Sequence, residues 1–99
     1  MNIKIQSVRF DADKKLLDYV KNKVSKLSQI ADNITSADVV LRLENDETNK
    51  NKIVEIRVGI PHSSDFFAKK QCKTFEESID LTAGALRRQI QKFKEKQRG

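Results

Sequence analysis

The residues best suited to chemistry in this sequence are the cationic side chains near its C-terminal end. Residues 84–99 carry six Lys or Arg side chains and a single acid, Glu95. At about 100° per residue on a helix, these cations form two rows on opposite flanks of an apolar stripe. One row is Arg88, Lys92 and Lys96, and the other is Arg87, Lys94 and Arg98. Cations that recur about once per helical turn can follow the phosphates of a nucleic acid.

An earlier helical segment adds Lys15, Lys23 and Lys26 along one side of its apolar face, with Lys21 across from them. A solvated helix face usually mixes both signs in pairs four residues apart, so the nearly single sign at the C-terminal end favours a polyanionic partner. The whole chain has 20 Lys and Arg against 14 acids, a net charge of +6. That total alone is equally compatible with a lysine-rich surface that stays solvated.

Few other side chains could support catalysis or metal binding. His62 is the only histidine and follows Pro61 in an expected turn, which favours a surface position. Cys72 is the only cysteine and has no histidine placed to activate it, so we expect a buried or incidental thiol. Asp11 and Asp13 could form a carboxylate pair, but helix capping explains at least one of them. We therefore expect no enzyme activity, no metal site and no cofactor.

The elements that must position the cations follow from hydrophobic periodicity. Roughly alternating apolar residues predict strands over 3–10, 38–43 and 53–60, and a less regular fourth over 66–69. Helical spacing predicts one helix after the N-cap candidate Asp13 and another after Thr74. The expected apolar stripes are Leu16, Leu17, Val20, Val24 and Leu27 in the first helix, and Phe75, Ile79, Ala83, Leu86, Ile90 and Phe93 in the second. The order β-α-β-β-β-α predicts a single α+β domain over residues 1–99, a four-stranded sheet with two helices packed on one face.

No apolar run approaches the roughly 20 residues that span a bilayer, and the first residues lack the pattern of a signal peptide. A lone cysteine, which can form no internal disulfide, suits a reducing compartment. We therefore expect a cytoplasmic protein that does not bind membranes.

Two adjacent aromatics, Phe66 and Phe67, could stack on bases as sheet aromatics do in RNA-recognition folds. Neighbouring residues of a strand face opposite sides, so at least one of the two should belong to the core. We expect the helices, rather than the sheet, to recognise RNA through its shape and backbone.

Three stretches in order resemble a known family. They are DYVKNKVSKL over 18–27, VVLRLE over 39–44, and SID over 78–80 followed by LRRQIQK over 86–92. The last is similar to the family's "AID…L-x-R-Q-L-x-K" second helix. The chain thus resembles the short form of the ribosome hibernation-promoting factor and ribosome-associated inhibitor family, also called the sigma-54 modulation protein family.

This resemblance implies a translation inhibitor that acts under stress or in stationary phase. Such a factor binds the small (30S) ribosomal subunit in the mRNA/tRNA channel near the decoding centre and contacts 16S rRNA through basic helical residues. The positions that match are Lys23 and Lys26 in the first helix and Arg88, Lys92 and Lys96 in the second. With Arg87 from the charge pattern, they are the expected RNA-binding residues. The short form implies a monomer when free, and pairing of ribosomes would require a second factor.

The sequence departs from the family pattern at two positions. Ala85 stands where a lysine is usual, and Glu76 stands where an aromatic residue is common, with Phe75 beside it. Two other functions fit the same residues. A general module for double-stranded RNA would also use helices beside a small sheet, and a protein–protein adaptor would use the lysines only to stay soluble.

Overall fold

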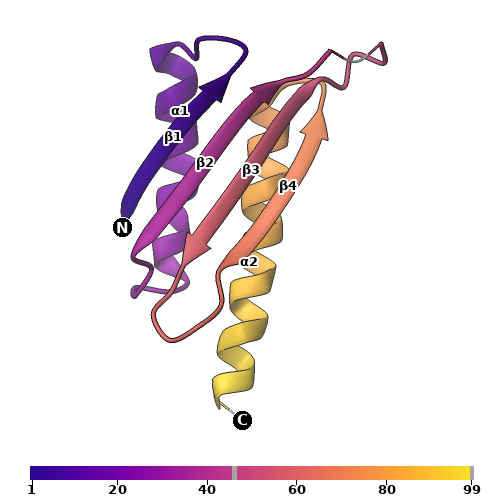
Figure 1. Ribbon diagram of the computed structural model, residues 1–99. Helices are drawn as coiled ribbons and strands as arrows, with labels where there is room; N and C mark the ends of the chain where they lie inside the picture. Colours follow the sequence, from indigo (N-terminus) through magenta and orange to yellow (C-terminus); the bar gives the residue numbers. More distant parts are fainter. Residues whose placement is uncertain (46, 99) are drawn as a thin grey trace.

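A four-stranded sheet with two helices on one of its faces forms the protein (Figure 1). The computed structural model describes residues 1–45 and 47–98, the last of these by its backbone alone. Its elements are β1 (Asn2–Val8), α1 (Lys14–Ser25), the short 3₁₀ helix η1 (Lys26–Gln29), β2 (Ser36–Leu43), β3 (Lys52–Gly59), β4 (Phe66–Cys72) and α2 (Phe75–Arg98). The predicted order β-α-β-β-β-α is confirmed. Asp46 and the side chain of Arg98 lie outside the described residues.

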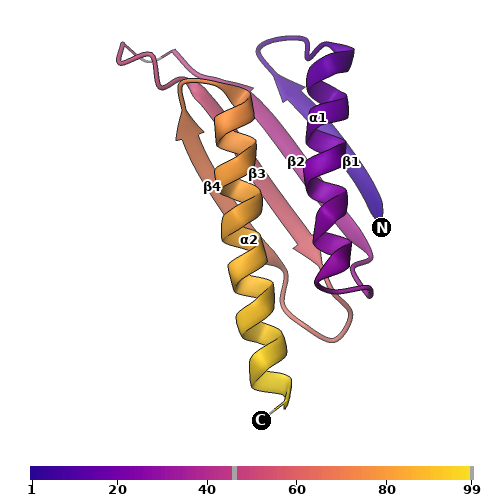
Figure 2. The same ribbon diagram turned by 180° about the vertical axis from the view of Figure 1, so that it is seen from behind.

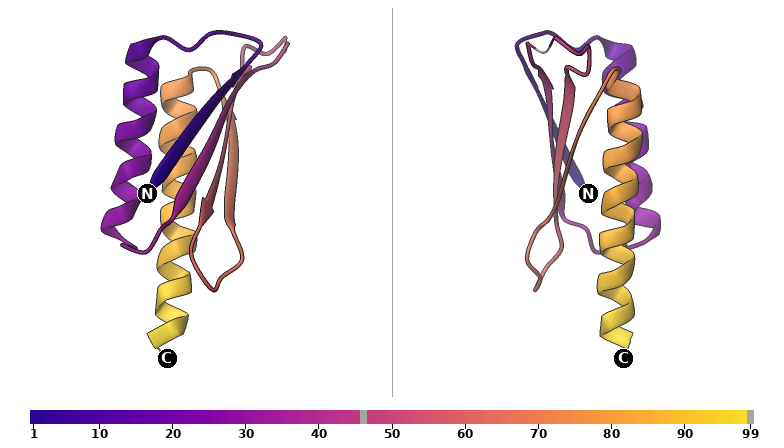
Figure 3. Two further views of the ribbon diagram at one scale, coloured as in Figure 1. Left: turned by 60° about the vertical axis from the view of Figure 1, so that its left-hand side comes forward. Right: turned by 90° about the vertical axis from the view of Figure 1, so that its right-hand side faces the viewer.

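The strands lie side by side in the order β1-β2-β3-β4. β1 pairs with β2 in parallel, and β2 with β3 and β3 with β4 pair antiparallel. A parallel pair needs a crossover connection, and α1 provides it. The two antiparallel pairs need only hairpin loops, so α2 follows the completed sheet and packs on the same face as α1 (Figures 2 and 3).

The core lies between the sheet and the two helices. Its fully buried members include Val20 and Val24 of α1, Leu41, Val54, Ile56 and Val58 of the central strands, and Ile79, Leu86 and Ile90 of α2. Alternate residues of each strand face this core because side chains of a strand alternate between the two faces. The remaining residues of each strand point to the uncovered side of the sheet, toward solvent.

Both helix starts have the predicted caps. An oxygen of the Asp13 carboxylate accepts a hydrogen bond from the backbone N–H of Leu16 at 2.8 Å. The Thr74 hydroxyl oxygen accepts one from the backbone N–H of Glu77 at 3.1 Å. Each cap satisfies a backbone donor that the first helical turn leaves unpaired. The first helix ends at Ser25, and Leu27, which the spacing placed in that helix, is buried from the 3₁₀ turn η1 instead.

The fourth strand is longer than its hydrophobic pattern predicted. It runs to Cys72 instead of ending at residue 69, because the solvent-facing lysines in its second half hide the alternation. Ala68 and Cys72 are its buried positions, which confirms the expectation of a buried thiol. The Ser78 hydroxyl of α2 is also buried and lies 2.8 Å from the carbonyl oxygen of Lys70 and 3.1 Å from that of Lys52. The apolar stripe did not reveal this polar link between α2 and the sheet.

Gly84, inside α2, has no steric reason to be glycine. A Cβ added there would meet only the Arg88 guanidinium, at 3.8 Å, which is ordinary contact. A glycine inside a helix often permits close packing against another helix. At Gly84 the structure shows no such close contact with α1.

We expect Gly84→Ala to raise the free energy of unfolding by about 0.5–1 kcal/mol, because alanine loses less backbone entropy in a helix. Urea unfolding monitored by circular dichroism measures the change. Gly59→Ala is the matched control and should give no such gain, because its Cβ would lie 3.1 Å from the Ser36 hydroxyl oxygen. An unchanged or lower stability in Gly84→Ala would contradict the prediction.

Candidate nucleic-acid interface

A groove of about 350 Å³ lies between α1 and α2 and brings together cations from both helices. Lys23 comes from α1, Lys26 from the start of η1 and Arg87 from the middle of α2. Figure 2 shows the two helices side by side in front of the sheet. We call Lys23, Lys26 and Arg87 the groove cluster. Sequence reasoning placed these residues on separate helices, and the fold makes them neighbours.

The groove contains one acid among its lining residues, Asp80 of α2. Its Oδ1 atom lies 3.3 Å from the Lys23 ammonium and accepts a hydrogen bond of 2.8 Å from the Tyr19 hydroxyl. The Lys23 ammonium also lies 5.6 Å from the centre of the Tyr19 ring, within cation–π range. Asp80 thus links two side chains of α1 to α2.

Sequence analysis did not identify Tyr19 and Asp80 as site residues. They are 61 residues apart, so no spacing within one element connects them. One weak signal was available: Tyr19, Lys23 and Lys26 recur at spacings of four and three and therefore share one side of the first helical segment.

Lys94 has a structural role instead. Its ammonium donates a hydrogen bond to the backbone carbonyl of Ile30, just after η1. A cation near such a helical C-terminus is favourable because the carbonyl groups there lack intrahelical partners. This contact ties the second half of α2 to the end of the first helical segment.

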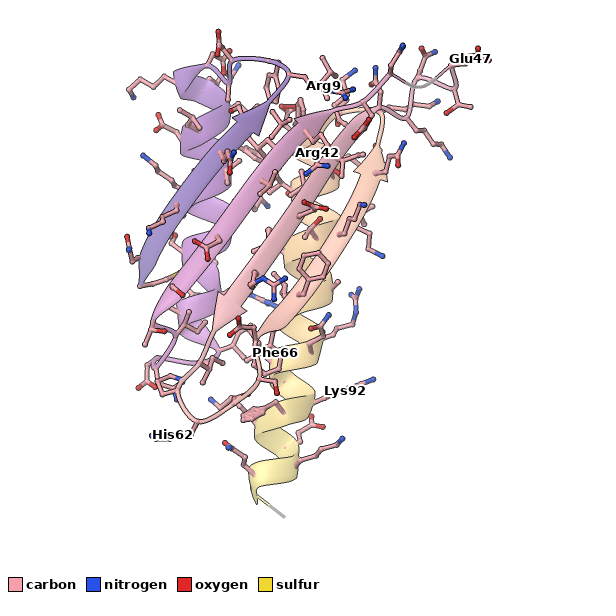
Figure 4. The ribbon with its side chains drawn as sticks, in the orientation of Figure 1. Arg9, Arg42, Glu47, His62, Phe66 and Lys92 are labelled. Carbon is pink, nitrogen blue, oxygen red and sulfur yellow. The ribbon has the colours of Figure 1, made fainter. Side chains whose placement is uncertain are left out.

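The remaining predicted cations belong to α2 and do not line the groove. Arg88, Lys92 and Lys96 are exposed and follow one another about once per turn. Figure 4 shows Lys92 projecting from the side of α2 that points away from α1. We call these three residues the flank row. The six predicted RNA-binding residues therefore fall into two groups, the groove cluster between α1 and α2 and the flank row on α2 alone.

Most of these cations are electrostatically uncompensated. Within the part of the chain that the structure describes, only Lys23 of the six has a carboxylate within ion-pair distance. The five unpaired cations are Lys26, Arg87, Arg88, Lys92 and Lys96. Their mutual repulsion falls when they neutralise an anion, which favours a polyanionic ligand on the helical side.

The uncovered face of the sheet has the opposite character. Glu55 lies 3.4 Å from Arg42 and 3.6 Å from Lys69, and Arg57 lies 3.9 Å from Asp65. Arg42 occupies this face in Figure 4. Cations that already have carboxylate partners attract anions less, so the uncompensated positive charge lies on the helical side of the fold.

The two adjacent aromatics divide as predicted. Phe66 is half-buried, packs against the core and meets the Phe93 ring edge to face at 5.4 Å. Phe67 is 43% exposed on the uncovered face, where the Arg57 guanidinium lies 5.2 Å from its ring centre.

His62 is exposed in the turn between β3 and β4, with a positive φ of 64°, as a surface residue would be. Among residues 1–45 and 47–98, no three or more His, Cys, Asp or Glu side chains come together as metal ligands would. Over the same residues, no helix has the length and apolar character needed to cross a bilayer.

The sequence profile of one family matches residues 3–98, nearly the whole chain. That family is described as "Sigma 54 modulation protein / S30EA ribosomal protein". The chain belongs to this family. The predicted resemblance is therefore confirmed.

Two relatives of the chain are both named ribosome hibernation promoting factor. The chain is 34% identical over 97 residues to the ribosome hibernation promoting factor of Azotobacter vinelandii, covering 98% of this chain and 86% of that protein. It is 29% identical over 97 residues to the protein of the same name from Pseudomonas putida, covering 98% and 90%.

Solved structures agree with the fold. The chain resembles the Thermus thermophilus Protein Y N-terminal domain with a TM-score of 0.79 and 26% identity, over 94% of this chain and 99% of that one. It resembles a ribosomal subunit interface protein from Coxiella burnetii with a TM-score of 0.83 and 21% identity, over 95% and 98%. The β-α-β-β-β-α arrangement is thus shared with solved proteins.

The contact between Tyr19 and Asp80 predicts a change that absorbance can detect. The hydrogen bond to the Asp80 carboxylate is the main cause that raises the pKa of Tyr19 above its ordinary value of 10.0. Tyr19 is the only tyrosine and the chain has no tryptophan, so an ultraviolet titration reports this residue alone. We expect a higher pKa in the folded protein than in urea, and Asp80→Asn should lower it toward the ordinary value.

The raised pKa of Tyr19 also makes the free energy of unfolding depend on pH. A group whose pKa is raised by folding stabilises the folded state below its unfolded pKa, and this contribution is lost as the pH rises through the folded value. The free energy of unfolding should therefore decline above about pH 10 more steeply in the wild type than in Asp80→Asn. Identical titrations of Tyr19 in both proteins would contradict the assigned contact.

Proposed function

We propose that this protein is a ribosome hibernation factor that binds the small ribosomal subunit and blocks translation. The observation that carries the proposal is the set of five cations on the helical side of the fold that have no carboxylate within ion-pair distance among residues 1–45 and 47–98. The relatives named ribosome hibernation promoting factor support it, as does the family description as an S30EA ribosomal protein. The specific site that we propose is the mRNA/tRNA channel of the 30S subunit near the decoding centre, with 16S rRNA as the direct ligand.

The geometry suits a ligand that surrounds α2. The groove cluster lies on the side of α2 that faces α1, and Lys92 of the flank row projects away from α1. With 24 residues, α2 is about 36 Å long and extends past the end of the sheet (Figure 3). The projecting end of α2, with exposed Lys96, can enter a channel, while the groove cluster can contact phosphates beside the packed part of the same helix.

Several parts of this proposal follow from the ribosomal partner. Occupying the channel would exclude messenger and transfer RNA, which makes the protein an inhibitor without catalysis, acting under stress or in stationary phase. The protein would work in the cytoplasm, as a monomer when free. Any pairing of ribosomes would need a second factor.

The first experiment is co-sedimentation of the purified protein with small subunits over a series of salt concentrations. We expect stoichiometric binding that weakens as salt rises, because phosphate contacts release counterions. Added messenger and transfer RNA should displace the protein. Binding that these ligands leave unchanged would contradict the proposed channel, and absence of binding at low salt would contradict the ribosomal partner.

Charge reversal tests the two clusters separately. Arg88→Glu/Lys92→Glu and Lys26→Glu/Arg87→Glu should each weaken small-subunit binding by about tenfold or more and flatten its salt dependence by about one phosphate per lost contact. Lys4→Glu/Lys50→Glu is the matched control, since it changes the net charge equally at exposed positions outside the helices.

The three variants also discriminate between the alternatives. Equal losses in all three would indicate non-specific attraction to RNA, and equal affinity of the wild type for arbitrary RNA duplexes would favour a general double-stranded RNA module. Unchanged affinity in both helical variants would contradict RNA binding by the helices. Salt-insensitive capture of an RNA-free partner would favour an adaptor.

A further inference from the structure

Asp80 is an anomaly on the helical side of the fold. It places a carboxylate in the groove that holds Lys23, Lys26 and Arg87, where a phosphate would also have to lie. Judged by charge alone, this carboxylate repels the ligand and weakens the binding proposed above. The contacts of Asp80 indicate a second effect, which strengthens the binding.

Those contacts fix the position of Lys23. The Asp80 Oδ1 atom lies 3.3 Å from the Lys23 ammonium and also accepts the hydrogen bond from Tyr19. The Tyr19 ring lies against the same ammonium, at 5.6 Å from its centre. A lysine has a long, flexible side chain, and it must lose rotamer freedom when it binds a phosphate. Here a carboxylate and an aromatic ring restrict that freedom before the ligand arrives.

The restricted ammonium remains available to a ligand. The Lys23 side chain is 35% exposed, and Lys23 lines the groove beside Lys26. An ammonium has three donor hydrogens, and the contact with Asp80 needs only one of them. The groove volume of about 350 Å³ is several times that of a water molecule, so a phosphate group has room there.

We propose that Asp80 is a positioning residue for RNA binding: it holds Lys23 in the groove, oriented toward a backbone phosphate shared with Lys26 and Arg87. This inference rests on the proposed function and specifies one contact within it. Preorganisation outweighs repulsion because Asp80 is itself bonded to two groups of α1, and an exposed carboxylate already paired with a cation repels a phosphate weakly.

The decisive variant is Asp80→Asn, which keeps the size of the side chain and removes its charge. Simple electrostatics predicts tighter binding to small subunits, whereas positioning predicts weaker binding, by about three- to tenfold. The matched control is Glu95→Gln, which removes the same charge from the same helix at an exposed acid with no ion pair among the described residues. It should leave binding unchanged or tighten it.

A double-mutant cycle separates positioning from a merely structural tie between the helices. Lys23→Met keeps the aliphatic stem and removes the ammonium. If Asp80 acts through Lys23, Asp80→Asn should no longer weaken binding in the Lys23→Met background. A structural role predicts the same loss in both backgrounds. All variants are compared at a temperature where circular dichroism shows them folded.

Each result decides between the ideas. Weaker binding in Asp80→Asn that vanishes in Lys23→Met supports the inference. Tighter binding in Asp80→Asn, or an equal loss in both backgrounds, overturns it while leaving the proposed function intact. If the wild type itself does not bind small subunits, the proposed function fails, and the positioning role falls with it.

Discussion

The burial of one face of the sheet by two helices is the constraint on which the rest of the structure depends. Leu41, Val54 and Ile56 of the central strands are fully buried, and only helices packed on that face can cover them. The parallel pairing of β1 with β2 requires a crossover, which brings α1 to this face, and α2 then covers the remainder. Packing two helices side by side leaves a groove between them, and polar side chains beside each apolar stripe must line it.

This packing sorts the charges of the protein. On the uncovered sheet face, cross-strand neighbours of opposite sign lie within reach, as Glu55 does between Arg42 and Lys69. On the helices, the last turns of α2 contain almost only cations and offer few carboxylates as partners. Cations on the sheet face are thus compensated by nearby carboxylates, whereas most cations on the helical side are not. Composition alone could not assign the polyanion to a side.

The sequence predicted the element order because each element has a strong local signal. Alternation identified β2 and β3, helical spacing identified both helices, and Asp13 and Thr74 marked where the helices begin. Local signals failed where tertiary contacts decide the structure. The end of β4 is set by pairing with β3, as in Ile53 with Gln71, although the strand's own residues there are mostly polar. Likewise, the buried hydroxyl of Ser78 is tolerated because strand carbonyls accept its hydrogen bond.

The candidate site shows the same division. The two cationic rows of α2 were predictable because they depend only on residue spacing. What the spacing could not supply is which row meets α1. That depends on how the helices pack, which brings Lys23 and Lys26 to Arg87 and ties Lys94 to the Ile30 carbonyl. The row that contains Lys94 is therefore partly used for structure, whereas the row of Arg88, Lys92 and Lys96 remains available to a ligand.

The length of α2 explains why the free row lies where it does. Seven- and eight-residue strands span roughly 25 Å, whereas α2 is about 36 Å long, so its last turns have no sheet beneath them. Ala85, at the position where the family resemblance implies a lysine, is half-buried against the core, at the level of the sheet. Arg88 still lies at the level of β4, since the neighbouring Gln89 side chain donates a hydrogen bond to the Phe67 carbonyl, whereas Lys96 lies in the last turns. Positive charge is thereby concentrated where no other element restricts the approach of a large ligand, which is the arrangement that a helix entering an RNA channel requires.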